Sequence, residues 1–141
     1  KANMNLQKMV QVLMVDDNPD DIELTVEAFK ETDKVYNVNV AQDGIEALKY
    51  LRKEDEFSAR PDPDLILLDL NMPKMNGFEV LEELKKDGTL NRIPVIVFSM
   101  SQNESDIKRV GELNAKAYIV KPVGFEGISD VVKRIEAILE T

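Results

Sequence analysis

The sequence contains no cysteine and no histidine. The lack of cysteine excludes disulfides, thiolate metal sites and cysteine nucleophiles. The lack of histidine excludes a histidine kinase, a phosphohistidine carrier, a histidine-containing catalytic triad and histidine-ligated zinc. Any metal site must therefore use oxygen ligands, which favours Mg²⁺, Ca²⁺ or Mn²⁺.

Long hydrophobic runs and an excess of positive charge are also missing. No run approaches the roughly 18 apolar residues that cross a bilayer, and residues 1–8 lack the apolar segment of a signal peptide. We therefore expect a cytoplasmic protein without membrane binding. The net charge of −9 disfavours binding to nucleic acid, because lysine and arginine must neutralise phosphates. The length of 141 residues suits a single domain at 10–141, preceded by an N-terminal extension or expression remnant at 1–9.

Short apolar runs alternate with segments of helical periodicity, which predicts alternating strands and helices. Strands are expected at residues 12–15, 36–41, 65–68, 94–98 and 116–120. Helices are expected from residue 19, from residue 44, and at 76–86, 103–114 and 125–139, with Gly111 weakening the fourth. The polar segment 54–63 is predicted to be a surface loop. Five such units predict an α/β fold, with helices on both faces of a five-stranded parallel sheet.

Polar side chains stand at the ends of four of the predicted strands. Asp16 and Asp17 follow the first strand, Asp69 the third, Ser99 the fourth and Lys121 the fifth. Each residue alone has a simpler explanation, such as a turn, a helix cap or a solvated charge. In an open parallel sheet, however, functional groups gather outside the carboxyl ends of the strands. The joint pattern therefore predicts one site.

The chemistry of this predicted site favours phosphoryl transfer. Three neighbouring carboxylates raise one another's pKa unless a cation lies among them. Mg²⁺ is suited to the position, because it binds few carboxylates and leaves room for phosphate oxygens. Asp69 is then a candidate nucleophile that forms an aspartyl phosphate. Lys121 would neutralise phosphoryl charge, and Ser99 would hydrogen-bond a phosphoryl oxygen.

Taken together, these motifs resemble those of the response-regulator receiver family. The matching segments are VDDN at 15–18, LLDLNMP at 67–73 followed by Gly77, VFS at 97–99, and YIVKP at 118–122. The resemblance extends over residues 10–139. It implies the flavodoxin-like, CheY-like strand order 2-1-3-4-5.

The resemblance also implies a role for individual acidic residues. Asp69 is implied to be the phosphorylation site. The implied Mg²⁺ ligands are Asp17, Asp69 and the backbone carbonyl of Asn71, with Asp16 acting through water. The domain is then not a conventional enzyme, but a phosphoacceptor that promotes its own phosphorylation and dephosphorylation.

Three further residues are implied to respond to the phosphoryl group. Lys121 contacts it, and the peptide bond from Lys121 to Pro122 is expected to be cis. Ser99 is the implied switch hydroxyl. Tyr118 is the implied switch aromatic, although an ordinary half-buried strand residue is the alternative for this position.

The implied function is that of a response regulator in two-component signal transduction. A sensor histidine kinase or a phosphotransfer protein would phosphorylate Asp69. The face made by the fourth helix, fifth strand and fifth helix would then change shape, and could support a homodimer. We expect Val110, Leu113, Ile119 and the outer side of the last helix on that face.

The segment 54–63 is longer than a minimal receiver needs. Together with Asn18-Pro19-Asp20-Asp21 it is most similar to single-domain regulators that pair with bacterial and cyanobacterial phytochromes. A phytochrome kinase is therefore the expected partner. Met100 departs from the small residue usual after the switch hydroxyl, and could restrict access to Asp69.

Three alternatives remain open. A Mg²⁺-dependent phosphatase or phosphotransferase is disfavoured, because Asn71 stands where such enzymes often place a second acid. A flavin-binding electron carrier is disfavoured, because the loop after the first strand is acidic and would repel phosphate. An interaction module that works without phosphorylation is excluded only by biochemistry.

Overall fold

Five short apolar segments form one parallel sheet in the computed structural model, which describes residues 9–140 of the chain. The strands are β1 (Val10–Val15), β2 (Tyr36–Ala41), β3 (Leu65–Leu68), β4 (Val95–Ser99) and β5 (Ala117–Val120). Their order in the sheet is β2-β1-β3-β4-β5, and every pair is parallel. The predicted fold class and strand order are confirmed.

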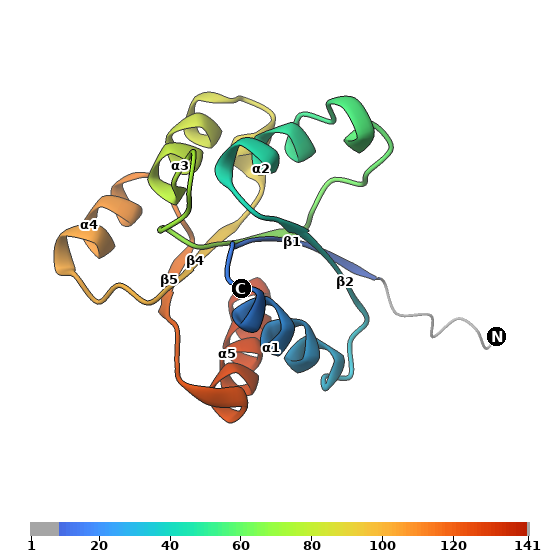
Figure 1. Cartoon of the computed structure of the whole chain (residues 1–141), viewed down its shortest axis with the longest axis vertical. Helices are drawn as coiled ribbons and strands as arrows, with labels where there is room; N and C mark the ends of the chain where they lie inside the picture. Colours follow the sequence, from blue (N-terminus) through green and yellow to red (C-terminus); the bar gives the residue numbers. More distant parts are fainter. Residues whose placement is uncertain (1–8, 141) are drawn as a thin grey trace.

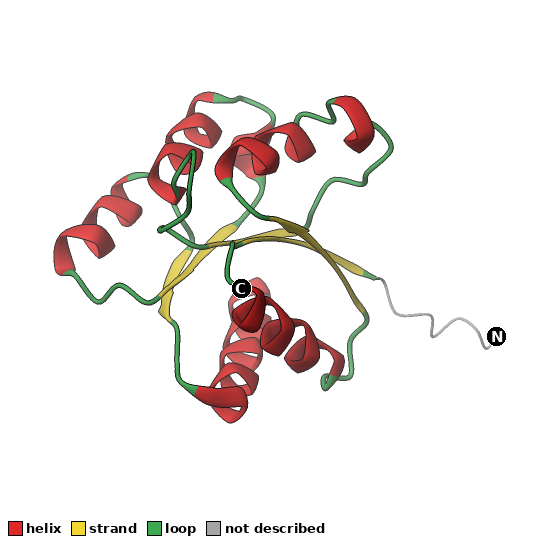
Figure 2. Ribbon diagram, in the orientation of Figure 1, coloured by secondary structure: helices red, strands yellow, loops and turns green. Residues whose placement is uncertain are grey.

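The helices cover both faces of the sheet (Figures 1 and 2). On one face lie α1 (Pro19–Lys30) and α5 (Gly124–Leu139), and on the other α2 (Gly44–Leu51), α3 (Gly77–Lys86) and α4 (Glu104–Glu112). Right-handed crossovers between parallel strands place each helix on a face determined by the direction of the crossover. Because both faces are covered, β3 and β4 are buried along their whole length.

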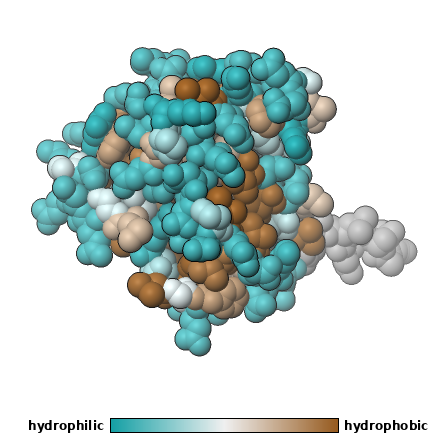
Figure 3. Space-filling model, in the orientation of Figure 1, coloured by the Kyte–Doolittle hydropathy of each residue, from teal (hydrophilic) through white to brown (hydrophobic). Residues whose placement is uncertain are grey.

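Alternation along the strands divides the apolar side chains between two cores. Leu13 and Val15 face α2, α3 and α4, whereas Val12 and Met14 face α1 and α5. Successive residues of a strand point to opposite sides of the sheet, so one apolar run serves both layers. Figure 3 shows a mostly hydrophilic surface, with a hydrophobic patch near the middle of this face and smaller hydrophobic spots elsewhere. In the described part of the chain, no helix has the length and hydropathy needed to cross a bilayer.

Side-chain caps define where four of the helices begin. The side chains of Asn18, Asp43, Asn76 and Asn103 each accept a backbone N–H of the first turn, which satisfies donors that a helix start leaves unpaired. The third and fourth helices therefore begin one residue later than predicted. The fourth also ends earlier, at Glu112, so its predicted bounds were too wide.

The predicted surface loop at 54–63 is partly folded. It contains a 3₁₀ helix, η2 (Asp55–Phe57), and a second 3₁₀ helix, η3 (Leu90–Arg92), precedes β4. The ring of Phe57 packs against the core, with its centroid 5.5 Å from that of Tyr50. Arg60 donates a hydrogen bond of 3.3 Å to Asn39 in β2. An apolar anchor within a polar segment explains why composition alone predicted only a loop.

Two residues expected on a responsive outer face are buried. Val110 belongs to the core beneath α4, and Ile119 to the core beneath α5, each with 1% of its surface exposed. The prediction was wrong for both, because α4 presents Val110 to the sheet and β5 presents Ile119 to α5. Leu113 is partly buried against the core. Ile107, exposed by 40%, is an outward-facing apolar residue of α4.

Candidate functional site

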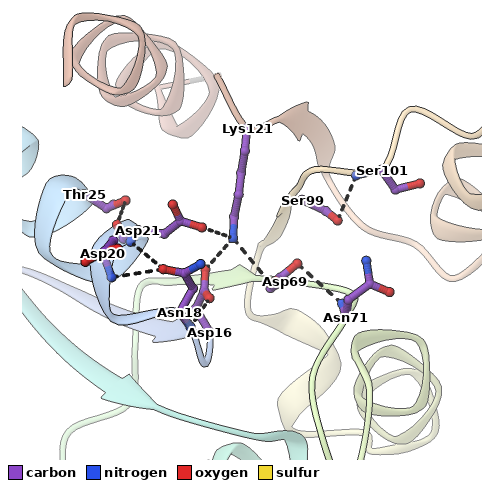
Figure 4. Close-up of polar contacts among 10 residues, drawn as sticks. All are labelled: Asp16, Asn18, Asp20, Asp21, Thr25, Asp69, Asn71, Ser99, Ser101 and Lys121. Carbon is purple, nitrogen blue, oxygen red and sulfur yellow. Dashed lines mark hydrogen bonds and ion pairs between the residues drawn. The ribbon is translucent and has the colours of Figure 1, made fainter. Parts of the chain in front are cut away.

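The carboxyl ends of β1, β3 and β5 bring three polar side chains to the same edge of the sheet. At each of these carboxyl ends, a backbone hydrogen bond extends the pairing with the neighbouring strand by one residue. The N–H of Asp16 donates to the carbonyl of Ala41 at 3.0 Å, and that of Asp69 to Val15 at 2.9 Å. The N–H of Lys121 donates to the carbonyl of Ser99 at 2.8 Å. The side chains of Asp16, Asp69 and Lys121 are therefore positioned by the sheet itself (Figure 4).

The ammonium group of Lys121 lies among three carboxylates. Its Nζ atom is 2.8 Å from Asp16 Oδ2, 2.8 Å from Asp21 Oδ2 and 3.3 Å from Asp69 Oδ2. The side chains of Lys121 and Asp16 are only 6% and 2% exposed. The structure thus joins the predicted lysine directly to two of the predicted acids, and to a third that was not predicted.

Burial and pairing act on the protonation of this cluster. Burial raises the pKa of Asp16 above its ordinary value, although hydrogen bonds from Lys121 and from the backbone N–H of Asn18 partly oppose this. Burial alone would lower the pKa of Lys121, but its hydrogen bonds to Asp16 and Asp21, together with the negative charges of Asp69 and Asp16, outweigh burial and raise that pKa. Lys121 is therefore a permanent positive charge at neutral pH and does not act as a base.

Three of the acids can share a metal ion. Asp16, Asp17 and Asp69 each offer a carboxylate oxygen, and these oxygens lie within 4.8 Å of one another. An all-oxygen set with an exposed member, Asp17, suits a hard cation that keeps some of its water. The backbone N–H of Asn71 donates to Asp69 Oδ1 at 3.4 Å, which places residue 71 beside the acid. Metal ligation by the carbonyl of Asn71 stays a prediction.

Ser99 and Tyr118 are connected by hydrogen bonds to the backbone of Ser101. Ser99 is fully buried, and its hydroxyl accepts a hydrogen bond from the backbone N–H of Ser101 at 3.3 Å. The hydroxyl of Tyr118 donates to the carbonyl of Ser101 at 2.8 Å. The Ser101 hydroxyl in turn donates to Asp106 in α4 at 2.7 Å. The loop between β4 and α4 is therefore tied to both predicted switch residues.

The comparisons with known proteins agree with this geometry. Residues 12–133 match the family model described as the response regulator receiver domain. The chain belongs to this family. The protein is a response regulator of two-component signalling. Receiver domains bind Mg²⁺ or Mn²⁺ at an acidic pocket, which corresponds here to the cluster of Asp16, Asp17 and Asp69.

Individual relatives resemble the receiver domain over nearly its whole length. Response regulator Rcp1 from Synechocystis sp. is 37% identical, over 92% of this chain and 89% of Rcp1. A crystal structure of the phosphorylated cyanobacterial phytochrome response regulator RcpA has a TM-score of 0.89 and 42% identity, covering 95% and 96% of the two chains. The Mn²⁺-bound form of Rcp1 has a TM-score of 0.84 and 36% identity, covering 91% and 92%.

Sequence reasoning missed the contact of Asp21 with the receiver site. From the sequence, Asp20 and Asp21 stand out only as part of the Asn18-Pro19-Asp20-Asp21 segment that resembles phytochrome-linked regulators. However, Asp21 lies in the first turn of a helix that starts directly after the acidic strand end, and one such turn reaches back over the same edge of the sheet. That spacing was the available signal.

Two further expectations concern residues next to the site. The Lys121–Pro122 peptide bond was expected to be cis and is trans, the isomer that proline also favours in general. Met100 is 72% exposed, so its side chain packs against little of the protein. An effect of Met100 on access to Asp69 stays a prediction.

Gly77 is required for the close approach of α3 to the phosphoacceptor strand. A Cβ atom at this position would lie against the backbone carbonyl oxygen of Asp69 and 2.8 Å from the Cα of Leu70. Because these neighbours are backbone atoms of a buried turn, they have little room to move. We expect Gly77→Ala to lower the free energy of unfolding by about 1–3 kcal/mol, measured by urea denaturation.

Gly111 is the matched control for this substitution. It lies inside α4, and a Cβ atom there would meet nothing within 4 Å. Gly111→Ala should therefore stabilise the protein by about 0.4–1 kcal/mol, since alanine restricts the unfolded chain more than glycine does. Shifts of the same sign in both variants would contradict the steric argument for Gly77.

Proposed function

We propose that Asp69 of this receiver domain accepts a phosphoryl group from phosphohistidine on a partner histidine kinase or phosphotransfer protein. The observation that carries the proposal is the position of the buried Asp69 carboxylate. It lies 3.3 Å from the Lys121 ammonium and shares an oxygen cluster with Asp16 and Asp17. A nucleophilic carboxylate, a fixed cation and a metal-competent acid pair are the groups that this transfer needs.

The proposed transfer forms one bond and breaks another. A carboxylate oxygen of Asp69 attacks phosphorus, and the phosphorus–nitrogen bond of phosphohistidine breaks. The bonding electrons go to the imidazole nitrogen, which then takes up a proton. Lys121 offsets negative charge on the phosphoryl oxygens. A bound Mg²⁺ would supply further positive charge and help to align the reacting groups.

We further propose that the phosphoryl group acts on α4 through Ser101. Ser99 would turn its hydroxyl toward a phosphoryl oxygen and so disturb the hydrogen bond from the Ser101 N–H. Ser101 also accepts a hydrogen bond from the Tyr118 hydroxyl with its carbonyl, and donates one from its hydroxyl to Asp106. A shift of Ser101 would therefore reach β5 and α4 together. This supports a population shift at the face formed by α4, β5 and α5.

The partners of the domain are proposed from its relatives and its charge. Likeness to regulators named for cyanobacterial phytochromes supports a phytochrome-type kinase. A cytoplasmic location follows from this partner, because histidine kinases draw their phosphoryl group from ATP. The net charge of −9 supports the lack of nucleic-acid binding. A homodimer through α4, β5 and α5 would bury the exposed Ile107.

Intact-mass measurement tests the proposed chemistry. The chain is incubated with acetyl phosphate, whose phosphorus–oxygen bond breaks to release acetate, in the presence of Mg²⁺. We expect the mass to increase by one phosphoryl group, and a chelator to prevent the increase. An unchanged mass in Mg²⁺ would contradict the proposal. Steady release of phosphate from an external phosphoester would favour the phosphatase alternative instead.

A further inference from the structure

The Lys121 ammonium uses its three N–H groups on three carboxylates, of which one is outside the possible metal cluster. Its two shortest contacts, both 2.8 Å, are to Asp16 and Asp21, and the contact to Asp69 is longer at 3.3 Å. Asp16 and Asp69 belong to the group that can share a metal ion, whereas Asp21 does not. Asp21 therefore binds the lysine without offering a ligand to that cluster.

The ammonium and a metal ion compete for the same oxygens. Asp16 accepts from Lys121 with Oδ2 and from the backbone N–H of Asn18 with Oδ1, so both of its oxygens are engaged. A cation bound by Asp16 and Asp69 would lie close to the ammonium that contacts the same two carboxylates. It must displace or repel that ammonium, because neighbouring like charges repel strongly in a buried site. A partner that holds Lys121 to one side would reduce this competition.

Asp21 is held in the right place to do this. Its backbone N–H donates to Asn18 Oδ1 at 3.1 Å, and its carbonyl accepts from the Thr25 hydroxyl at 2.7 Å. These bonds fix the first turn of α1 with the Asp21 carboxylate directed at Lys121 (Figure 4). The Asp21 side chain is 25% exposed and that of Asp16 is 2% exposed, so the Asp21 carboxylate keeps more contact with water.

We propose that Asp21 is a positioning residue that shares the Lys121 ammonium with Asp16 and Asp69, weakening its hold on these two carboxylates and leaving them more available to a divalent cation. The inference rests on the proposed function, because it assumes that Asp16, Asp17 and Asp69 form the metal site. With Asp21 neutralised, Lys121 relies more on Asp16 and Asp69, and the cation competes with a more tightly held ammonium. Asp21 thus acts on the metal through Lys121.

The test is the dissociation constant for Mg²⁺, measured by calorimetry without any phosphodonor. Asp21→Asn should weaken Mg²⁺ binding about fivefold, the scale of one charge-assisted hydrogen bond partly replaced by a neutral one. The matched control is Asp20→Asn. Asp20 is the exposed neighbour of Asp21 in the same helical turn; its backbone N–H donates to Asn18 Oδ1, and its carboxylate has no hydrogen bond or ion pair with residues 9–140. Its substitution should change the constant by less than about twofold.

A double-mutant cycle separates action through Lys121 from simple charge attraction. In a Lys121→Met background, Asp21→Asn should have no more effect than Asp20→Asn. An undiminished fivefold loss in that background would overturn the proposal, since Asp21 would then act directly on the cation. Asp21→Glu gives an independent test with Lys121 present. It keeps the charge and should bind Mg²⁺ within about twofold of the wild type.

The outcomes distinguish this inference from the proposed function. If the wild type binds Mg²⁺ and gains a phosphoryl group, but Asp21→Asn matches Asp20→Asn, only the role of Asp21 is wrong. If the wild type binds no Mg²⁺ and its mass does not change with acetyl phosphate, the proposed function itself is wrong. A selective loss in Asp21→Asn that vanishes without Lys121 supports both.

Discussion

Asp69→Asn is expected to abolish phosphoryl uptake from acetyl phosphate, leaving the intact mass unchanged under conditions in which the wild type gains one phosphoryl group. The substitution is nearly isosteric, so the buried position beside Lys121 remains filled. The amide, however, offers no carboxylate oxygen as a nucleophile. Loss should therefore be complete and should not depend on the time of incubation or on the concentration of Mg²⁺.

The chemical stability of the product identifies the acceptor. An acyl phosphate on Asp69 should be removed by hydroxylamine, whereas a phosphate ester on the nearby Ser99 would resist it. Asp20→Asn makes the same change at an exposed acid and should leave uptake intact. A mass gain that persists in Asp69→Asn would assign the acceptor role to another residue.

How well the site could be predicted from sequence depended on what positions each residue. Asp16, Asp69 and Lys121 each stand directly after a strand of a parallel sheet, and the ladder carries them to one edge. The topology therefore determines their meeting, and the strands are recognisable from composition. The position of Asp21 in the first turn after the strand end brings it back to the same edge, which the spacing could have indicated. Its contact with Lys121 in particular depends also on the angle at which α1 leaves the strand, and the spacing does not encode that angle.

The errors in the fold have a similar origin. Val110 and Ile119 are apolar residues in segments that also carry exposed positions, and sequence alone did not reveal which side of α4 or β5 faces the core. Strand β5 has only four residues, and three of them are partly exposed, so alternation along it indicates only weakly which side chains face the core. Phe57 was missed because a single aromatic anchor in a polar segment has no periodicity. In each case tertiary packing decided the outcome.

Lys121→Met is expected to lower the free energy of unfolding by about 3–5 kcal/mol at neutral pH in the presence of a chelator. The substitution keeps a side chain of similar length but removes the charge that Asp16 and Asp69 share. Two largely buried carboxylates are then left without their partner. Urea denaturation of the two proteins measures the difference. Lys116→Met, at the exposed other end of β5, is the control and should change stability by less than about 0.5 kcal/mol.

The difference in unfolding free energy between the wild type and Lys121→Met should become smaller as the pH falls. Burial already raises the pKa of Asp16 in the folded protein above the unfolded value of 3.8, and loss of Lys121 raises that pKa further. A carboxyl group with a raised folded pKa favours folding at low pH, and this contribution is lost as the pH rises through the folded pKa. The variant should therefore recover stability relative to the wild type as the pH falls from neutrality toward 3.8. A difference that stays constant over this range would contradict a carboxylate origin.

Besides acidification, added Mg²⁺ should restore stability to the Lys121→Met variant. Without the ammonium, a divalent cation meets no competing charge at Asp16 and Asp69, so it should bind the variant more tightly than the wild type. A ligand that binds only the folded state stabilises it in proportion to the logarithm of one plus the ratio of its concentration to its Kd, so at one concentration the tighter binder stabilises more. The increase in the unfolding midpoint on adding Mg²⁺ should accordingly be larger for the variant. Equal increases would mean that Lys121 and the cation do not share these carboxylates, and that the lysine serves the phosphoryl group alone.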